Sequence, residues 1–207
     1  MTPSPAAAES VEDRVLDAAG ELFYARGLQA VGMDAIRGAS GVSLKRLYQL
    51  FPSKDALVEA YLRRRGERWR GALARHVEAV PPGPGRVLAV YDRLGRWFAE
   101  PDFRGCAFVN SFGELGGTSP AVAALARAHK DAFRRYVAGL VDAAGVPAAL
   151  TDPLMLLAEG AITTAALSGS AEPARHAREA ARVLLDHAVA GRPRPGGSRQ
   201  AENAPAG

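Results

Sequence analysis

Apolar residues recur at helical spacing along most of the chain. The first such stripe, over 10–26, consists of Val11, Val15, Ala18, Ala19 and Leu22. A repeat of three to four residues is typical of a helix with one buried face. Gly27 follows directly and suits a helix end in the left-handed conformation. No run of alternating β-branched residues marks a strand, so the pattern predicts an all-α fold.

Two short helices are predicted next, over 33–40 and 43–50. Gly41 lies between them and provides the positive φ that a tight turn requires. Ser43 is a suitable N-cap for the second helix, and Pro52 ends it because the residue before a proline disfavours helical geometry. The segment therefore reads as helix, tight turn, helix.

A long helix is predicted from Ser53 to about residue 80, where Pro81-Pro82-Gly83-Pro84 interrupts it and forms a hinge. Further helices are predicted at 85–99, 106–115, 120–144, 153–168 and 173–191, which brings the total to about nine. Three of these helices begin with a capping residue followed by proline: Ser119-Pro120, Asp152-Pro153 and Glu172-Pro173.

Composition and helix pattern divide the chain into four parts. Residues 1–9 and 192–207 are rich in Pro, Ala and Gly, which predicts a flexible tail at the N-terminus and a disordered tail at the C-terminus. Residues 10–65 form an N-terminal helical domain, and 66–191 form a larger helical domain.

Charge becomes informative only when its distribution is considered. The formal net charge of the 207-residue chain is +4, which alone predicts no nucleic-acid partner. The stretch 35–54, however, contains no acidic residue. Its cations are Arg37, Lys45, Arg46 and Lys54. This stretch coincides with the two short helices, so their outer face is predicted to be basic.

The chain shows no feature of an exported or membrane protein. Residues 1–10 lack the charged and apolar regions of a signal peptide. The single cysteine, Cys106, excludes an intramolecular disulfide and fits a reducing, cytoplasmic setting. The stretch 153–171 has one charge, Glu159, but few large aliphatic residues, so it is predicted to be a buried helix and not a membrane span.

The second short helix has the chemistry of a major-groove reader. Val42, Leu47, Leu50 and Phe51 are suited to anchor it on the core. The remaining positions of the helix are Ser43, Leu44, Lys45, Arg46, Tyr48 and Gln49. Among these, lysine and arginine can bind guanine edges or phosphates, and glutamine can pair with adenine. Tyrosine and serine can donate to phosphates, while leucine is either a surface residue or a contact to a thymine methyl group.

The next helix start adds an anion site, formed by its backbone N–H groups and Lys54. The alternative is a helical hairpin whose basic face is only solvated. The turn spacing favours DNA binding over that alternative.

At this point the sequence resembles the TetR family of transcriptional regulators. The segment GASGVSLKRLYQLFPSKDALVEAYL, 38–62, is similar to the family signature, and the close resemblance covers about 11–65. The positions that match are Gly41, Val42, Ser43, Leu47, Tyr48, Phe51, Ser53, Lys54 and Leu57. The resemblance implies that 10–65 is a three-helix, helix-turn-helix DNA-binding domain. It also implies that 66–191 is a helical ligand-binding and dimerisation domain.

Two positions depart from the family pattern. The family usually has Thr or Ser where the second helix begins, and this chain has Val31-Gly32. Glycine can still cap the helix, but a hydroxyl contact to phosphate is missing. Gly32 and Met33, at the start of this helix, are among the residues predicted to contact DNA. Arg37 replaces the usual Ala and is either a further cation near DNA or a solvated one.

The larger domain contains a segment, RGCAFVNSFGELG at 104–116, that is similar to one found in a large TetR subgroup. Some of its residues are candidates for the wall of a ligand pocket, which is predicted to be mostly apolar with a few polar groups. The candidate ligand-binding residues are Tyr91, Trp97, Phe98, Cys106, Phe108, Asn110, Phe112 and Met155. The alternative for each is plain core packing. Cys106 is either a small buried apolar residue or a redox sensor.

Small residues in the penultimate helix favour close helix–helix approach and a homodimer formed by the last two long helices. They are Gly160, Ala161, Thr164, Ala165, Ala166 and Gly169. Burial within one chain is the alternative. Two readers in a two-fold dimer lie about 34 Å apart and require a palindromic operator.

These observations predict a sequence-specific transcriptional regulator that acts as a repressor dimer. A small effector is predicted to lower the affinity of the dimer for its operator, and the helix that begins at Ser53 is predicted to carry this change between the two domains. Activation and a non-enzymatic interaction module with a basic face are the alternatives. The four histidines have no paired metal spacing, and no nucleophile–base motif is present. We therefore expect no catalytic site, metal or cofactor.

Overall fold

Helices account for all the regular structure in the part of the chain that the computed structural model describes, residues 10–190. The helices are α1 (Val11–Arg26), α2 (Met33–Ser40), α3 (Leu44–Leu50), α4 (Lys54–Glu78), α5 (Pro84–Phe98), α6 (Ala107–Leu115), α7 (Pro120–Ala143), the short 3₁₀-helix η1 (Ala148–Leu150), α8 (Thr151–Ser168) and α9 (Glu172–Ala190). The predicted all-α fold is confirmed, and the predicted bounds hold to within a few residues for most helices.

Serine side chains start four of these helices. The Oγ atoms of Ser10, Ser43, Ser53 and Ser119 each accept a hydrogen bond from the backbone N–H three residues ahead, at 3.0–3.3 Å. Each bond satisfies a donor that the first helical turn leaves without a partner. The caps predicted at Ser43, Ser53 and Ser119 are thereby confirmed.

Two predicted helix ends differ from the structure. Gly27 has φ 89° and ψ 158°, so its φ is positive but its conformation is not left-handed helical. Asp152 lies inside α8 instead of capping it, because η1 leads directly into α8 at Thr151. The Asp152 carboxylate instead accepts two hydrogen bonds from Arg134, at 2.6 and 3.1 Å. The helix end predicted at Gly191 and the two predicted tails lie outside the described residues.

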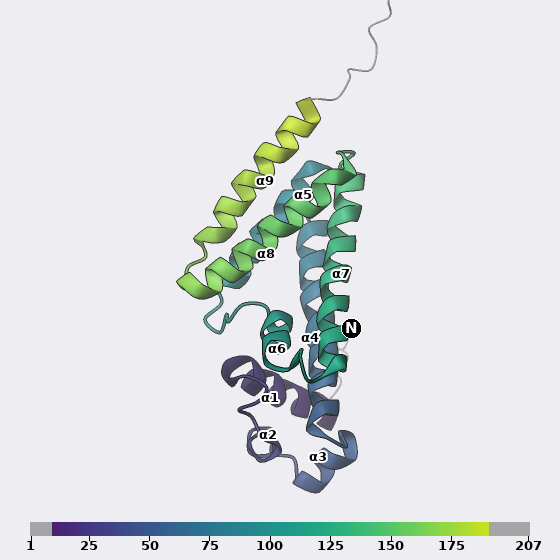
Figure 1. The fold of residues 1–207 in the computed structure, drawn as a ribbon, viewed down its shortest axis with the longest axis vertical. Helices are drawn as coiled ribbons and strands as arrows, with labels where there is room; N and C mark the ends of the chain where they lie inside the picture. Colours follow the sequence, from purple (N-terminus) through teal and green to yellow (C-terminus); the bar gives the residue numbers. More distant parts are fainter. Residues whose placement is uncertain (1–9, 191–207) are drawn as a thin grey trace, which may run out of the picture.

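The molecule is elongated, with α1, α2 and α3 at one end and α5, α8 and α9 at the other, while α6 lies in the middle beside α1 and α7 runs from the middle toward the larger end (Figure 1). Helix α4 runs between the two ends and packs against α1, α5 and α7. Helices α8 and α9 pack against each other and against α5, along one side of the larger end. No helix within 10–190 is long and apolar enough to cross a membrane.

The small end has its own apolar centre, which joins the larger core through α4. Val15, Ile36, Leu47 and Leu57 bring together one fully buried side chain from each of α1 to α4. Burial of such a side chain contributes about 1.5–3 kcal/mol. Because α3 has only seven residues, its position depends on this packing.

We expect Leu47→Ala to lower the free energy of unfolding by about 2–5 kcal/mol, because Leu47 is fully buried and the change leaves a cavity. Gln49→Ala on the exposed face of the same helix should change it by no more than about 0.5 kcal/mol. Urea denaturation followed by circular dichroism, at equal protein concentrations, measures both. Equal effects of the two substitutions would contradict this account of the core.

Candidate nucleic-acid interface and its connection to the helical domain

The turn between α2 and α3 depends on the backbone conformation of Gly41. Gly41 has φ 68° and ψ 13°, the left-handed region that side chains with a Cβ rarely adopt. Its N–H donates to the Arg37 carbonyl at 3.1 Å and closes α2. The Ser40 hydroxyl accepts from the N–H of Val42 at 3.3 Å, so the turn has its own hydrogen bonds.

Burial of one face of α3 determines which side chains point outward. Leu47 is fully buried, and Val42 and Phe51 at the two ends of the helix are buried as well. The predicted DNA-contacting side chains of α3 lie on its other faces. Ser43, Lys45, Arg46 and Gln49 are exposed, Tyr48 is 47% exposed, and Leu44 is half-buried. The structure thus brings six predicted residues onto one short, accessible helix.

The remaining predicted contacts are less uniform. Lys54 begins α4 and donates from Nζ to the Gln29 carbonyl at 3.4 Å, which ties its ammonium to the loop between α1 and α2. Gly32 is exposed and precedes α2. The Met33 side chain, by contrast, is buried in the core, because it packs on the inner face of α2 with Ile36. Only its backbone N–H remains available at the helix start.

Arg37, the departure from the family pattern, is not a free cation. Its Nε lies 3.3 Å from Oδ1 of Asp34, one turn earlier on α2. Arg46 similarly contacts Gln49, with 3.4 Å between Nη1 and Oε1. Both pairs are exposed, so each can be exchanged for contacts to another partner at little cost.

This helix–turn–helix lies inside a segment, 15–61, that matches the family model described as bacterial regulatory proteins, tetR family. This segment of the chain belongs to the TetR family.

Its relatives agree with that assignment. Two curated HTH-type transcriptional regulators of Mycobacterium tuberculosis, from strains CDC 1551 and H37Rv, are each 33% identical to this chain over 125 residues. The match covers 58% of this chain and 61% of each relative, so it spans less than two thirds of their length.

Solved structures extend the likeness over more of the molecule. A TetR-family transcriptional regulator from Streptomyces coelicolor superposes with a TM-score of 0.78 at 27% identity, over 86% of this chain and 89% of the other. A second structure, that of a putative TetR transcriptional regulator from Streptomyces avermitilis, has a TM-score of 0.71 at 29% identity and covers 87% of this chain and 98% of the other. Both ends of this TetR-family fold are therefore shared with relatives.

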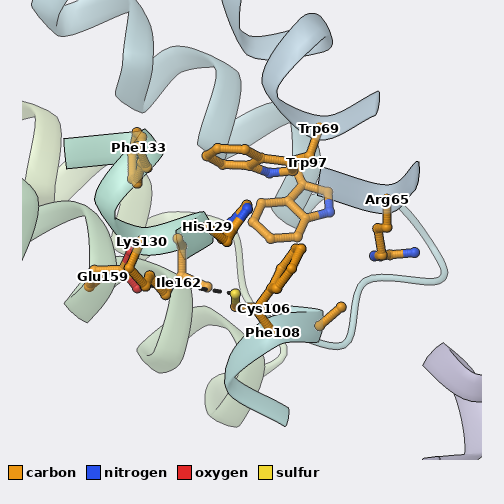
Figure 2. A pocket seen from close by; sticks show the side chains of 11 residues that line it. Arg65, Trp69, Trp97, Cys106, Phe108, His129, Lys130, Phe133, Glu159 and Ile162 are labelled. Carbon is orange, nitrogen blue, oxygen red and sulfur yellow. Dashed lines mark hydrogen bonds and ion pairs between the residues drawn. The ribbon is translucent and has the colours of Figure 1, made fainter. Parts of the chain in front are cut away.

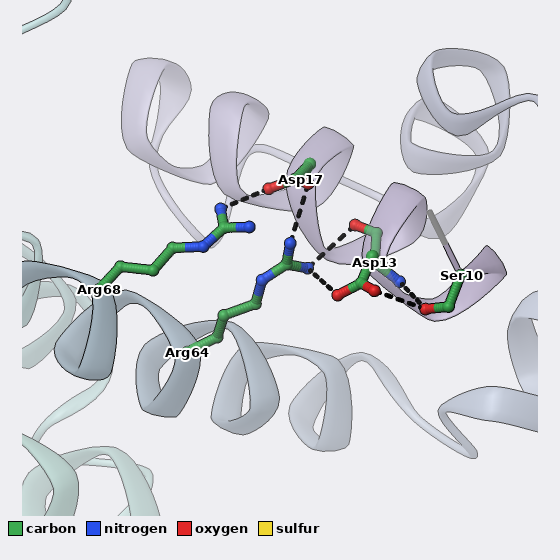
Figure 3. Close-up of polar contacts among 5 residues, drawn as sticks. All are labelled: Ser10, Asp13, Asp17, Arg64 and Arg68. Carbon is green, nitrogen blue, oxygen red and sulfur yellow. Dashed lines mark hydrogen bonds and ion pairs between the residues drawn. The ribbon is translucent and has the colours of Figure 1, made fainter. Parts of the chain in front are cut away.

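Arginines of α4 fasten α1 of this TetR-family protein from the side (Figure 3). Arg64 donates from Nη1 to the Asp13 carbonyl and from Nη2 to the Asp17 carboxylate, both at 2.9 Å. Arg68 donates to the other Asp17 oxygen at 2.6 Å. Burial by itself raises the pKa of Asp17, but the hydrogen bond from Arg68 and the charge of Arg64 outweigh it and hold that pKa below its ordinary value.

Two further contacts tie the small end to α6 and the loop before it. The Tyr24 hydroxyl donates to the Gly105 carbonyl and accepts from the N–H of Arg104, both at 2.8 Å. Gln29 donates its backbone N–H to Glu114 Oε2 at 2.9 Å and its Nε2 to the Glu114 carbonyl at 2.8 Å. No local pattern in the sequence predicts these contacts, because they join residues 80 or more positions apart.

An inner cavity lies among α4 to α8 and contains three of the eight predicted ligand-binding residues, Trp97, Cys106 and Phe108 (Figure 2). The other side chains that line it are Arg65, Trp69, Ala107, His129, Lys130, Phe133, Glu159 and Ile162. No periodicity distinguishes these eight from ordinary core or surface positions, so the sequence alone did not identify them.

The other five predicted ligand-binding residues lie apart from this cavity. Tyr91, Phe98 and Met155 are buried in the core, and the Tyr91 hydroxyl donates to the Leu154 carbonyl at 2.8 Å. Asn110 lines a separate small pocket beside α1. Phe112 is 48% exposed on the outer face of α6.

Polar groups in the inner cavity are only partly matched with one another, because His129 Nδ1 and Glu159 Oε1 are buried without a hydrogen-bond partner in the described part of the chain. Lys130 donates from Nζ to Glu159 at 2.5 Å and lies 3.4 Å from Cys106 Sγ. His129 stacks on Phe108 with 3.8 Å between ring centroids. Burial, assisted by the charges of Lys130 and Arg70, lowers the pKa of His129 to about 3, so the ring is neutral at physiological pH. The cavity encloses only about 20 Å³, which is little more than the space of a water molecule. No set of three metal-ligating side chains occurs within 10–190.

We expect Asp17→Asn to lower the urea midpoint at neutral pH, because the change removes a carboxylate that Arg64 and Arg68 bind. A pKa below 3.8 in the folded protein means that this stabilisation is present above pH 3.8 and is lost as the pH falls through the lowered value. The difference between variant and wild type should therefore shrink in acid. Asp131→Asn, at an exposed residue of α7 that makes no ion pair within 10–190, is the control. A pH-independent difference for Asp17→Asn would contradict the electrostatic origin.

Proposed function

We propose that this chain is a sequence-specific DNA-binding transcriptional regulator that acts in the cytoplasm as a homodimeric, ligand-responsive repressor on a palindromic operator. The observation that carries the proposal is the geometry of α3. Its buried Leu47 and the Gly41 turn hold the helix so that Lys45, Arg46, Tyr48 and Gln49 are presented to solvent together. A short helix with this set of donors suits the major groove.

In this proposal each exposed side chain has a role that follows from its chemistry. Arg46 and Gln49 read base edges, and their mutual contact in the free protein keeps both near the same face of α3. Tyr48 and Lys54 bind phosphates and set the register of the helix on DNA. The backbone N–H groups at the start of α4 add donors for a phosphate beside the Lys54 ammonium.

The dimer is proposed to form through α8 and α9, because an apolar groove lies open on these helices. Leu156 and Leu167 of α8 are 73% and 85% exposed in one chain. The groove is lined by Leu156, Leu157, Gly160, Ala161, Thr164, Pro173, His176 and Ala177. A second copy related by two-fold symmetry would cover it. Of the small residues named above, Ala161 and Ala165 are buried within one chain, while Gly160, Thr164, Ala166 and Gly169 are exposed.

Ligand response is proposed to run through α4 and α6. Helix α4 begins at Lys54 beside the reader and continues into the wall of the inner cavity at Arg65 and Trp69. Helix α6 lines the same cavity with Phe108 and binds Gln29 of the small end through Glu114. A ligand that binds one arrangement of these helices more tightly shifts the equilibrium toward that arrangement. The size of the shift is set by the difference in its affinity for the two arrangements, and the spacing of the two α3 helices in the dimer changes with it.

Selection from a library of random duplexes at physiological salt tests the proposal. Recovery of one palindromic site by the purified full-length protein is the expected result. Binding that shows a steep salt dependence but no sequence preference would contradict the proposal and favour an interaction module with a basic face. Transcription measured from the recovered site, with and without the protein, distinguishes a repressor from an activator.

Arg46→Ala should lower affinity by about 1–3 kcal/mol per altered half-site and relax the preference at one base position, because an arginine that reads a base carries sequence information. Lys54→Ala should weaken binding to all sequences alike and reduce the salt slope by about one per subunit. Arg63→Gln, whose side chain pairs with Glu59 on α4, is the control. Identical effects of Arg46→Ala and Lys54→Ala would argue against separate reading and positioning roles.

Leu156→Glu should convert the dimer into monomers in sedimentation velocity experiments, because a carboxylate buried in an apolar interface loses its hydration. Val109→Glu places the same charge at a residue of α6 that is also largely exposed, and it should leave the dimer intact. Circular dichroism confirms that both variants fold. A dimeric Leu156→Glu protein would place the interface elsewhere.

A further inference from the structure

A spacious cleft lies between the small end and the helical domain. It encloses about 530 Å³, whereas the inner cavity encloses about 20 Å³. Sites for small organic ligands typically need roughly 300–1,000 Å³. Arg65, Trp69 and Trp97 line both spaces, so the inner cavity adjoins the cleft at these three side chains. A ligand of ordinary size therefore has room in the cleft and not in the inner cavity alone.

Arg65 is the half-buried guanidinium of this cleft that lacks a carboxylate partner. Its neighbours Arg64 and Arg68 pair with Asp17, and Arg93 pairs with Glu100 at 3.6 Å. No acidic side chain lies within 4.0 Å of Arg65 among residues 10–190. Instead its guanidinium carbon lies 3.7 Å from the centroid of the Tyr24 ring, which orients the group and leaves its planar donors without an anion.

The side chains that line the cleft carry one more positive charge than negative charges. The cleft is lined by five arginines and four carboxylates: Arg64, Arg65, Arg68, Arg93, Arg104, Asp17, Glu21, Glu100 and Asp102. Arg104 also lacks an ion pair within 10–190, but its side chain is exposed, as are those of Glu21 and Asp102. Exposed groups are hydrated and screened, whereas a half-buried guanidinium gains more from a bound anion.

Aromatic surface lies beside this guanidinium. The rings of Trp69 and Trp97 meet edge to face with 6.0 Å between centroids, and both line the cleft as well as the inner cavity. Phe133 supports Trp69 and Phe103 supports Trp97, each with 5.0 Å between centroids. These contacts hold the two indoles in place, so a flat ring could pack on them without reordering the site.

We propose that the cleft binds a planar aromatic carboxylate, with its carboxylate paired to Arg65 and its ring packed against Trp69 and Trp97. The fork of a guanidinium matches a carboxylate in two parallel hydrogen bonds. Such a ligand touches α1, α4 and α5 at once, and so bridges the small end and the helical domain. That its binding alters DNA affinity rests on the proposed function; the binding itself does not.

Isothermal titration calorimetry of the full-length protein with 2-naphthoate and its neutral isostere 2-naphthamide tests the site. We expect naphthoate to bind at least about tenfold more tightly than the amide, since the two ligands differ in the charge that Arg65 would pair with. Arg65→Gln should reduce this ratio to about one. Arg63→Gln, two residues earlier on α4 and paired with Glu59 outside the cleft, should retain it.

Arg65→Lys serves as a second variant, because Arg65→Gln also removes the contact with Tyr24 and can loosen the fold. The lysine keeps the charge without the fork, so a reduced preference for naphthoate is expected. Equal binding of acid and amide by the wild type, no naphthoate binding, or an unchanged ratio in a folded Arg65→Gln protein would each overturn the proposal. Melting curves establish which variants are folded.

The two proposals fail separately, because calorimetry uses no DNA. A protein that selects a palindromic operator but does not distinguish naphthoate from naphthamide retains the proposed function and loses this site. A protein that binds naphthoate through Arg65 but selects no operator retains this site and loses the regulator.

Discussion

Helix α4 contributes buried side chains to the apolar core at both ends of the molecule. The helix packs against α1 on one side and against α5 and α7 of the helical domain on the other. Leu57 and Leu62 are buried in the first part of α4, and Leu73 and Val77 are buried near its end. Between these parts lies Gly66, where a Cβ would come within 2.9 Å of Arg70 and 3.1 Å of Phe108. Glycine in a helix interior costs about 1 kcal/mol, and here it lets α6 and α7 approach α4 closely.

This close approach explains why the site chemistry gathers at the middle of α4. On one side of the helix Phe108 and His129 stack beside Gly66 and form the inner cavity. On another side Arg64 and Arg68 hold α1 through Asp17. The residues of α4 that line the inner cavity, Arg65 and Trp69, therefore lie within about one turn of the residues that hold α1, Arg64 and Arg68.

The contacts between α6 and the small end differ in kind from those of α4. They are hydrogen bonds made by Tyr24 to the loop before α6 and by Gln29 to Glu114 near the end of α6. The small end is thus joined to the rest of the molecule both by the core around α4 and by these polar contacts.

Local patterns in the sequence were sufficient for the helices, for three serine caps and for the Gly41 turn, because each depends on residues within one or two turns of one another. The amphipathic pattern also determined which side of α3 faces solvent. The burial of Met33, the pairing of Asp152 with Arg134 and the Glu114 contact to Gln29 were decided by tertiary structure. So was the unpaired state of Arg65, because only the folded chain assigns Asp17 to its two neighbours. The sequence shows which residues carry a charge. The ion-pair partner of each residue depends on distances between side chains, and these are set only when separate helices pack together.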